Sequence, residues 1–215
     1  MLDPDRLLLL LVTDRRRSRV PLERAVAAAV QGGVTAVMLR ERDLATDKLV
    51  ELGRPLRQIC RDAGVLFMVN GDLSAAQALD ADGAHLGYGA PPLTEARRTL
   101  GKGAILGAST HDEEELERSL QDGADYVTYG PVFATPKSQH EREPRGVTGL
   151  RRAVLRAGVV PVVALGGVTV ARAAQLRSAG AAGVAGIRCF LATSDPHSAA
   201  AQLRAAWQAP GQVSK

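Results

Sequence analysis

Short apolar runs alternate with amphipathic stretches along almost the whole chain of 215 residues. Continuous runs of Val, Leu, Ile and Ala are typical of buried parallel strands, and apolar residues at helical spacing indicate helices that cover them. The predicted strands cover residues 7–13, 35–40, 66–70, 84–86, 104–109, 126–132, 162–165 and 183–187. The predicted helices cover residues 21–32, 46–63, 73–79, 94–100, 113–121, 148–157, 169–178 and 196–207. This alternation predicts an α/β fold, a single (β/α)8 TIM barrel over residues 1–209, with residues 210–215 as a loose tail.

The composition narrows the classes of partner. Aromatic residues make up 3% of the chain and hydrophobic residues 46%, so the core is expected to be aliphatic. The formal net charge of +4 suits an anionic small molecule, but no long basic stripe or aromatic platform favours nucleic acid. The apolar run 7–13 is too short to cross a bilayer, and Cys60 and Cys189 lack the spacing of a metal site. We therefore predict a cytoplasmic protein with free thiols and no membrane partner.

Glycines follow the last two predicted strands. Gly166 and Gly167 come directly after the seventh strand, and Gly186, Ile187 and Arg188 end the eighth. Backbone N–H groups at such turns and helix starts bind phosphate in TIM barrels, and glycine lets the backbone approach a ligand closely. These five residues are the predicted phosphate site, so the expected ligand is a phosphorylated small molecule. Arg188 points either into the mouth of the barrel, toward the phosphate, or outward to an acid on a neighbouring loop.

Polar side chains follow the other strands, at the end of the barrel where the active sites of this fold lie. The candidates for binding substrate are Arg40, Arg42, Asn70, Ser109, Thr135 and Lys137. Among them, Arg40 offers a rigid two-pronged donor that matches phosphate. The long loop over residues 133–146, which contains Thr135 and Lys137, is a candidate lid.

Structural roles compete with functional ones at several positions. Arg40 can instead pair with Glu41, and Asn70 can be a turn residue before a glycine. His85 lies within a strand, where a histidine is usually a satisfied core residue. The run Arg15, Arg16, Arg17 and Arg19 is expected to be solvated. No dense carboxylate or His/Cys cluster predicts a metal site.

Several of these pieces occur together in one known family. The matching segments include Leu11-Val12-Thr13-Asp14, Leu39-Arg40-Glu41-Arg42-Asp43, Val69-Asn70, Ala81-Asp82-Gly83-Ala84-His85-Leu86-Gly87, Gly130-Pro131-Val132-Phe133 and Ala164-Leu165-Gly166-Gly167-Val168. In order and spacing they resemble the thiamine-phosphate synthase/TenI family of TIM barrels, from Leu7 to about Asp195. Synthases of that family join a hydroxymethylpyrimidine pyrophosphate to a thiazole phosphate carboxylate and release pyrophosphate and carbon dioxide. TenI-like members isomerise the thiazole phosphate carboxylate to its aromatic tautomer.

Two departures from the synthase pattern fall on its magnesium-binding carboxylates. The synthase motif after the third strand is Asn-Asp, where this chain has Asn70-Gly71. The motif after the fourth strand ends in an aspartate, where this chain has Ala90. The resemblance therefore implies a TenI-like thiazole tautomerase that transfers a proton without metal or other cofactor. Two alternatives stay open: a magnesium-dependent thiamine-phosphate synthase, with Asp72 as a substitute carboxylate, and a non-enzymatic sensor of phosphate ligands or partner in the pathway.

A tautomerase needs a group that titrates near neutral pH. Some tautomerases of the family carry a histidine after the sixth strand, where this chain has Pro131, so His111 and His140 are the candidate catalytic residues. The predicted ligand is a thiazole phosphate. We also predict a homo-oligomer whose candidate interface residues are Tyr88, Phe190 and Trp207, the alternative for Trp207 being packing of the last helix on the barrel.

Overall fold

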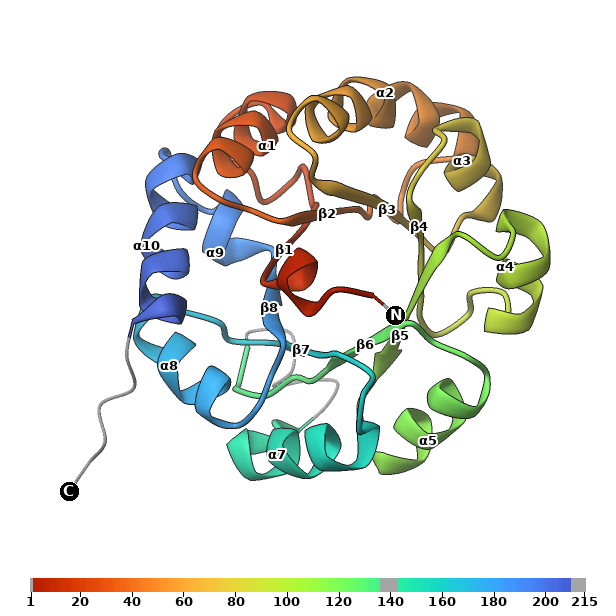
Figure 1. The fold of residues 1–215 in the computed structure, drawn as a ribbon. Helices are drawn as coiled ribbons and strands as arrows, with labels where there is room; N and C mark the ends of the chain where they lie inside the picture. The colour runs from red at the N-terminus through yellow and green to blue at the C-terminus, as the bar shows by residue number, and fades with distance from the viewer. Residues whose placement is uncertain (1, 136–142, 210–215) are drawn as a thin grey trace.

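The structure, a computed structural model, describes residues 2–135 and 143–209. Eight parallel strands close into one barrel in chain order, and β8 pairs back to β1. The helices form an outer ring around the strands (Figure 1). The predicted TIM barrel is confirmed. The predicted loose tail and the candidates Lys137 and His140 lie outside the described residues.

The strands are short and the helices vary in length. The strands are β1 (Leu9–Val12), β2 (Ala36–Leu39), β3 (Leu66–Asn70), β4 (Gly83–Leu86), β5 (Ile105–Thr110), β6 (Tyr126–Tyr129), β7 (Val162–Leu165) and β8 (Gly183–Gly186). The helices are η1 (Pro4–Leu7), α1 (Leu22–Gln31), α2 (Thr46–Asp62), α3 (Leu73–Ala78), α4 (Leu93–Leu100), α5 (Glu113–Gln121), α7 (Gly146–Ala157), α8 (Val170–Ser178), α9 (Arg188–Leu191) and α10 (Pro196–Gln208).

The largest differences from the predicted boundaries lie at the first and sixth strands. Residues 4–7 form the 3-10 helix η1, whose Leu7 is fully buried with the side chains inside the barrel. Figure 1 shows η1 in the middle of the ring of strands, so it closes the amino end of the barrel. Strand β6 ends at Tyr129 because the chain then turns toward β7, where the Val132 amide donates to the Leu165 carbonyl at 2.8 Å. The short helix α9 follows β8 and was not predicted from the sequence.

Alternate side chains of each strand face the barrel interior and the helices. On β1, Leu10 belongs to the interior cluster, whereas Leu9 and Leu11 pack under the helices. Tyr126 of β6 is the bulkiest fully buried side chain, and its ring lies where a Cβ at Gly107 would be. Glycine at position 107 is therefore required for the tyrosine to fill the interior.

The three candidate interface residues differ sharply in their exposure to solvent. Phe190 and Trp207 are buried in the core between barrel and helices, so they are wrong as interface residues, and the packing role of Trp207 is confirmed. Tyr88, in contrast, is 98% exposed. Cys60 and Cys189 are free, and burial raises the pKa of each thiol to about 12, which keeps both in the unreactive protonated form. Within the described residues, no helix combines the length and apolar character needed to span a membrane.

Candidate active site at the carboxyl end of the barrel

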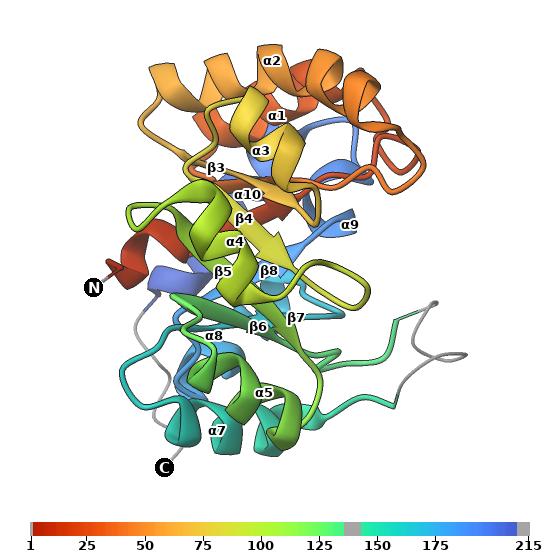
Figure 2. The same ribbon diagram turned by 90° about the vertical axis from the view of Figure 1, so that its right-hand side faces the viewer.

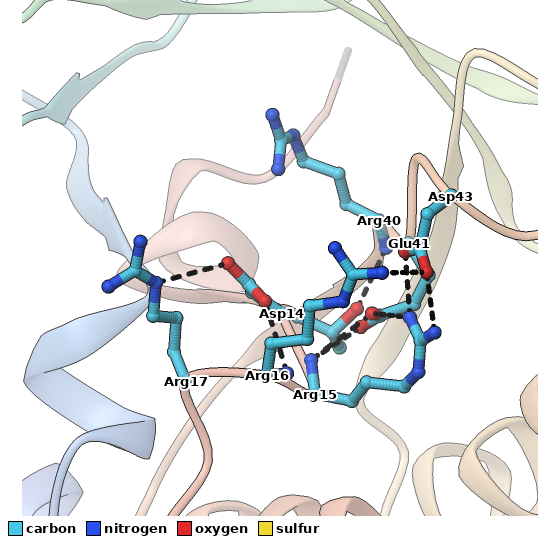
Figure 3. A network of polar contacts seen from close by, with 8 residues as sticks. Asp14, Arg15, Arg16, Arg17, Arg40, Glu41 and Asp43 are labelled. Atoms are coloured by element: carbon cyan, nitrogen blue, oxygen red, sulfur yellow. Dashed lines mark hydrogen bonds and ion pairs between the residues drawn. The ribbon is translucent and has the colours of Figure 1, made fainter. Parts of the chain in front are cut away.

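A cavity of about 380 Å³ opens at the carboxyl ends of β1 and β2. Its lining comes from the two loops that follow these strands: Asp14, Arg16, Arg17, Arg40, Glu41, Arg42 and Asp43. The strands hold the loops together, because the Thr13 amide donates to the Met38 carbonyl and the Arg40 amide donates to Thr13 Oγ1 at 2.8 Å. Four guanidinium groups and three carboxylates therefore line one small space. Figure 3 labels all of these residues except Arg42, together with Arg15.

Arg15 neutralises two of these carboxylates without lining the cavity itself. Its amide donates to both carboxylate oxygens of Glu41, at 3.0 and 3.1 Å, and its guanidinium donates to Glu41 Oε2 at 3.0 Å. The same guanidinium makes a two-pronged contact with Asp43, at 2.8 and 2.6 Å. Arg15 thereby lowers the pKa of Asp43 to about 2, and the two acids raise the pKa of Arg15 above its usual value.

The other arginines of the run also contact carboxylates. Arg16 Nη2 lies 2.8 Å from Asp43 Oδ2, and Arg17 Nε lies 3.7 Å from Asp14 Oδ2. Arg16, Arg17 and Arg19 are exposed, as the prediction of a solvated run has it, but Arg15 departs from it because its side chain is only 31% exposed and bonds Glu41 and Asp43. What the sequence did not reveal is that the partners of Arg15 and Arg16 lie on a loop 26 to 28 residues further along the chain, whereas Arg17 pairs with the nearby Asp14.

Arg40 is arranged differently from these residues. Its guanidinium points away from Glu41 (Figure 3), and among the described residues it has no hydrogen-bond or ion-pair partner. The predicted alternative, a pair with Glu41, is wrong because Arg15 occupies that carboxylate. Burial lowers the pKa of Arg40, and the neighbouring charge of Arg42 lowers it further. A half-buried cation without a counter-ion favours the binding of an anion.

A chain of polar groups lies inside the barrel beneath this mouth. His85 is 2% exposed, with Nδ1 2.9 Å from the Tyr126 hydroxyl and Nε2 2.9 Å from Ser109 Oγ. The Tyr126 hydroxyl also donates to Met68 Sδ at 3.2 Å. Burial, and to a lesser extent the charge of Arg40, lower the pKa of His85 to about 3, so the ring is neutral at physiological pH. His85 therefore has the satisfied structural role, and Ser109 is engaged with it.

The two candidate catalytic histidines are not brought together by the described structure. His111 Nδ1 lies 2.6 Å from Glu115 Oε2, and the His111 amide donates to the same oxygen at 2.8 Å. These contacts tie His111 to the start of α5, where Asp112 caps the helix through the Glu115 amide at 2.9 Å. His140 and Lys137 lie outside the described residues, and Thr135 is the last described residue before them, half-buried.

Gly166 and Gly167 adopt positive φ angles of 99° and 64°, which favour glycine. A Cβ at Gly166 would lie 2.7 Å from Pro131, and one at Gly167 would lie 2.6 Å from the Phe133 Cβ. Part of the reason for glycine is thus close packing against the loop after β6, which the sequence interpretation missed. Gly186 and Ile187 lead into α9. Arg188, at the start of α9, is exposed and pairs with no acid among the described residues, so the predicted outward ion pair is not formed by that part of the chain.

The family model described as "Thiamine monophosphate synthase" matches residues 9–190. The chain belongs to this family. It is 41% identical over 198 residues to the thiamine-phosphate synthase of Chloroflexus aurantiacus, covering 92% of this chain and 91% of that protein. It is 40% identical to the thiamine-phosphate synthase of Moorella thermoacetica, covering 92% and 93%. Among solved structures, the thiamine phosphate pyrophosphorylase from Pyrococcus furiosus matches with a TM-score of 0.87 at 33% identity, covering 95% of this chain and 97% of that one.

These similarities bear directly on the two branches of the thiamine-phosphate synthase/TenI family. The relatives at about 40% identity are named synthases, so the family is confirmed, but the comparisons favour the synthase over the TenI-like branch. The similarity to 3-hexulose-6-phosphate synthase, at 20% identity and a TM-score of 0.64, shows the shared barrel alone.

The residues present do not fit the magnesium site that the synthase pattern implies. A Cβ at Gly71 would lie 4.0 Å from the Ala90 Cβ, so side chains at these two positions would be neighbours, yet neither position carries a carboxylate. The Asp72 carboxylate, one residue further along, is engaged in the fold: Oδ1 accepts from the Ala75 amide at 2.8 Å and Oδ2 from the Thr46 hydroxyl at 2.7 Å. In the described parts of the chain, no three His, Cys, Asp or Glu residues are grouped to hold a metal ion.

Proposed function

We propose that this protein is a thiamine-phosphate synthase. The observation that carries the proposal is identity of about 40% to proteins of that name, over more than 90% of this chain and of theirs. The substrates would be a hydroxymethylpyrimidine pyrophosphate and a thiazole phosphate carboxylate. The basic cavity after β1 and β2 supports this assignment, because a pyrophosphate needs several cationic donors.

The transfer places specific demands on the site. The bond between the pyrimidine methylene carbon and the pyrophosphate oxygen breaks, and its electron pair leaves with pyrophosphate. The thiazole nitrogen supplies the electron pair of the new carbon–nitrogen bond. Carbon dioxide leaves when the bond between the ring carbon and its carboxylate breaks, and the ring carbon keeps that electron pair and takes a proton from solvent. The half-buried guanidinium of Arg40 suits the charge that develops on the leaving oxygens. His85 is neutral and hydrogen-bonded to Tyr126 inside the barrel, so it stabilises the structure below the mouth and does not contribute a charge that could stabilise the leaving group.

A second candidate is the thiazole tautomerase of the TenI-like branch. One specific observation favours it: positions 71 and 90, which are neighbours in space, both lack the carboxylate that the synthase pattern has there. The tautomerase function also needs a residue that moves a proton as general acid or base, and neither histidine suits this role, because His85 is neutral and buried and His111 is hydrogen-bonded to Glu115.

One pair of assays separates the two functions. The purified protein is incubated with both synthase substrates, and thiamine phosphate is measured by chromatography with and without magnesium. In parallel, the two thiazole carboxylate tautomers are followed by NMR. Formation of thiamine phosphate above the rate without protein supports the synthase. Equilibration of the tautomers without any thiamine phosphate contradicts the synthase and supports the tautomerase.

A further inference from the structure

Positions 71 and 90 lack the carboxylates that would hold a divalent ion against the negative charge of pyrophosphate. Pyrophosphate leaving from carbon carries several negative charges, which enzymes commonly balance with a divalent ion. Such an ion needs hard oxygen ligands from the protein in addition to the phosphates. Gly71 and Ala90 supply none, and Asp72 is bonded to Ala75 and Thr46. With no carboxylate at positions 71 and 90, cationic side chains of the protein can supply the positive charge for the proposed synthase reaction.

The mouth cavity holds that charge in guanidinium groups. Together with Arg15, its lining contains five arginines and three carboxylates, a formal excess of two positive charges. Arg15 bonds both Glu41 and Asp43, so each of these carboxylates keeps a cationic partner even when Arg16 turns from Asp43 toward a ligand. Within the described residues, the guanidinium groups of Arg40 and Arg42 have no acidic partner.

Arg16 and Arg17 can bind an anion together with Arg40 and Arg42, because giving up their present ion pairs costs little stability. Their side chains are 69% and 61% exposed, and their ion pairs with Asp43 and Asp14 are of the surface kind, which contribute little to stability. Both are on the loop after β1, opposite Arg40 and Arg42 on the loop after β2, and all four line the same cavity. An anion in this cavity would also relieve the repulsion between Arg40 and Arg42 that lowers the pKa of Arg40.

We propose that Arg16 and Arg17 act with Arg40 and Arg42 to bind the pyrophosphate group, and that these guanidinium groups balance its charge in place of a metal ion held by carboxylates. The proposal rests on the synthase function proposed above. When the carbon–oxygen bond breaks and its electron pair stays on pyrophosphate, the guanidinium groups donate hydrogen bonds to the phosphate oxygens. No proton or electron is transferred to the protein in this step, so no further reactant is needed.

Calorimetry with inorganic pyrophosphate tests the site directly. The full chain is titrated in buffer containing EDTA and again in magnesium. We expect binding in EDTA, with no gain from magnesium, because the cation and the arginines compete for the same oxygens. The double variant Arg16→Gln/Arg17→Gln should bind at least about tenfold more weakly, as expected for lost charge-assisted contacts. Arg19→Gln is the matched control, an exposed arginine of the same run that does not line the cavity, and should bind like the wild type.

Two results would overturn the proposal. One is pyrophosphate binding that appears only when magnesium is added. The other is a double variant that binds pyrophosphate as tightly as the Arg19→Gln control. Failure of the synthase function would look different, because pyrophosphate would still bind in EDTA while the two substrates gave no thiamine phosphate.

A converse experiment restores the carboxylates. In Gly71→Asp/Ala90→Asp the two side chains begin 4.0 Å apart, so both carboxylates can reach one cation. The φ of +77° at position 71 is tolerated better by Asp and Asn than by most residues. We expect magnesium to raise the melting temperature of this variant, and not that of the wild type or of the matched Gly71→Asn/Ala90→Asn variant. A wild-type protein that magnesium stabilises as much as the Asp variant would contradict the proposal, because the native residues would then already hold the ion.

Discussion

The buried His85 should make the protein less stable as the pH falls below neutrality. Its pKa is lowered from 6.5 to about 3 in the folded protein, because burial disfavours the charged ring. Its contribution is therefore fully present above pH 6.5 and is lost progressively as the pH falls toward 3, since the unfolded chain binds the proton first. One proton linked in this way costs about 2 kcal/mol of unfolding free energy between pH 7.5 and pH 5.

Urea denaturation at pH 7.5 and pH 5 measures this loss. In His85→Gln the group cannot titrate, so we expect most of the difference between the two pH values to disappear, whatever the starting stability of the variant. His197→Gln is the control, because His197 is exposed on α10 and its loss should leave the pH dependence unchanged. Carboxylates titrate mainly below this window, so they contribute little to the comparison. An equal pH dependence in wild type and His85→Gln would refute the reasoning.

Three further predictions concern the contacts around the mouth. Tyr126→Phe removes a fully buried hydroxyl that lies 2.9 Å from His85 and donates to Met68, and should destabilise the fold by about 1–3 kcal/mol in urea denaturation. Arg15→Gln leaves the Glu41 carboxylate buried without its guanidinium partner, and should lower the free energy of unfolding by about 1.5–3 kcal/mol. Adding Glu41→Gln should restore part of this stability, and a double variant no more stable than Arg15→Gln would contradict the pairing. The pKa of Asp43, lowered from 3.8 to about 2 by Arg15, means that its contribution is present above pH 3.8 and lost as the pH falls toward 2, so Asp43→Asn should flatten that part of an acid unfolding curve followed by circular dichroism.

The barrel could be predicted because its causes are local. Each strand is a continuous apolar run, and each helix has apolar residues at helical spacing, so the βα repeat is visible without tertiary information. The failures have local causes as well. Leu7 reads as the start of the first strand because it is apolar, but Asp3 caps a 3-10 helix there by accepting from the Asp5 amide at 3.0 Å.

The site was predictable only in outline. The rule that active sites lie after the strands gave Arg40 and Arg42, and both line the mouth cavity. The rule cannot say which acid pairs with which arginine, because pairing across neighbouring loops depends on strand register. Asp72 illustrates the same limit, since only the structure shows that Thr46 of α2 and the start of α3 both bond its carboxylate.

The four charged residues after β2 show how one short segment serves both structure and chemistry. Glu41 is almost fully buried and bonds Arg15, which ties the loop after β1 to the loop after β2. Asp43 adds a second anchor for the same guanidinium. The alternating arginines, Arg40 and Arg42, have no acidic partner in the described structure and face the cavity. The net charge of these four residues is zero, because two arginines alternate with two acids. In the fold, however, both acids bond Arg15, so Arg40 and Arg42 stay available to an anionic ligand. The net charge of the segment therefore underestimates how well it can bind an anion.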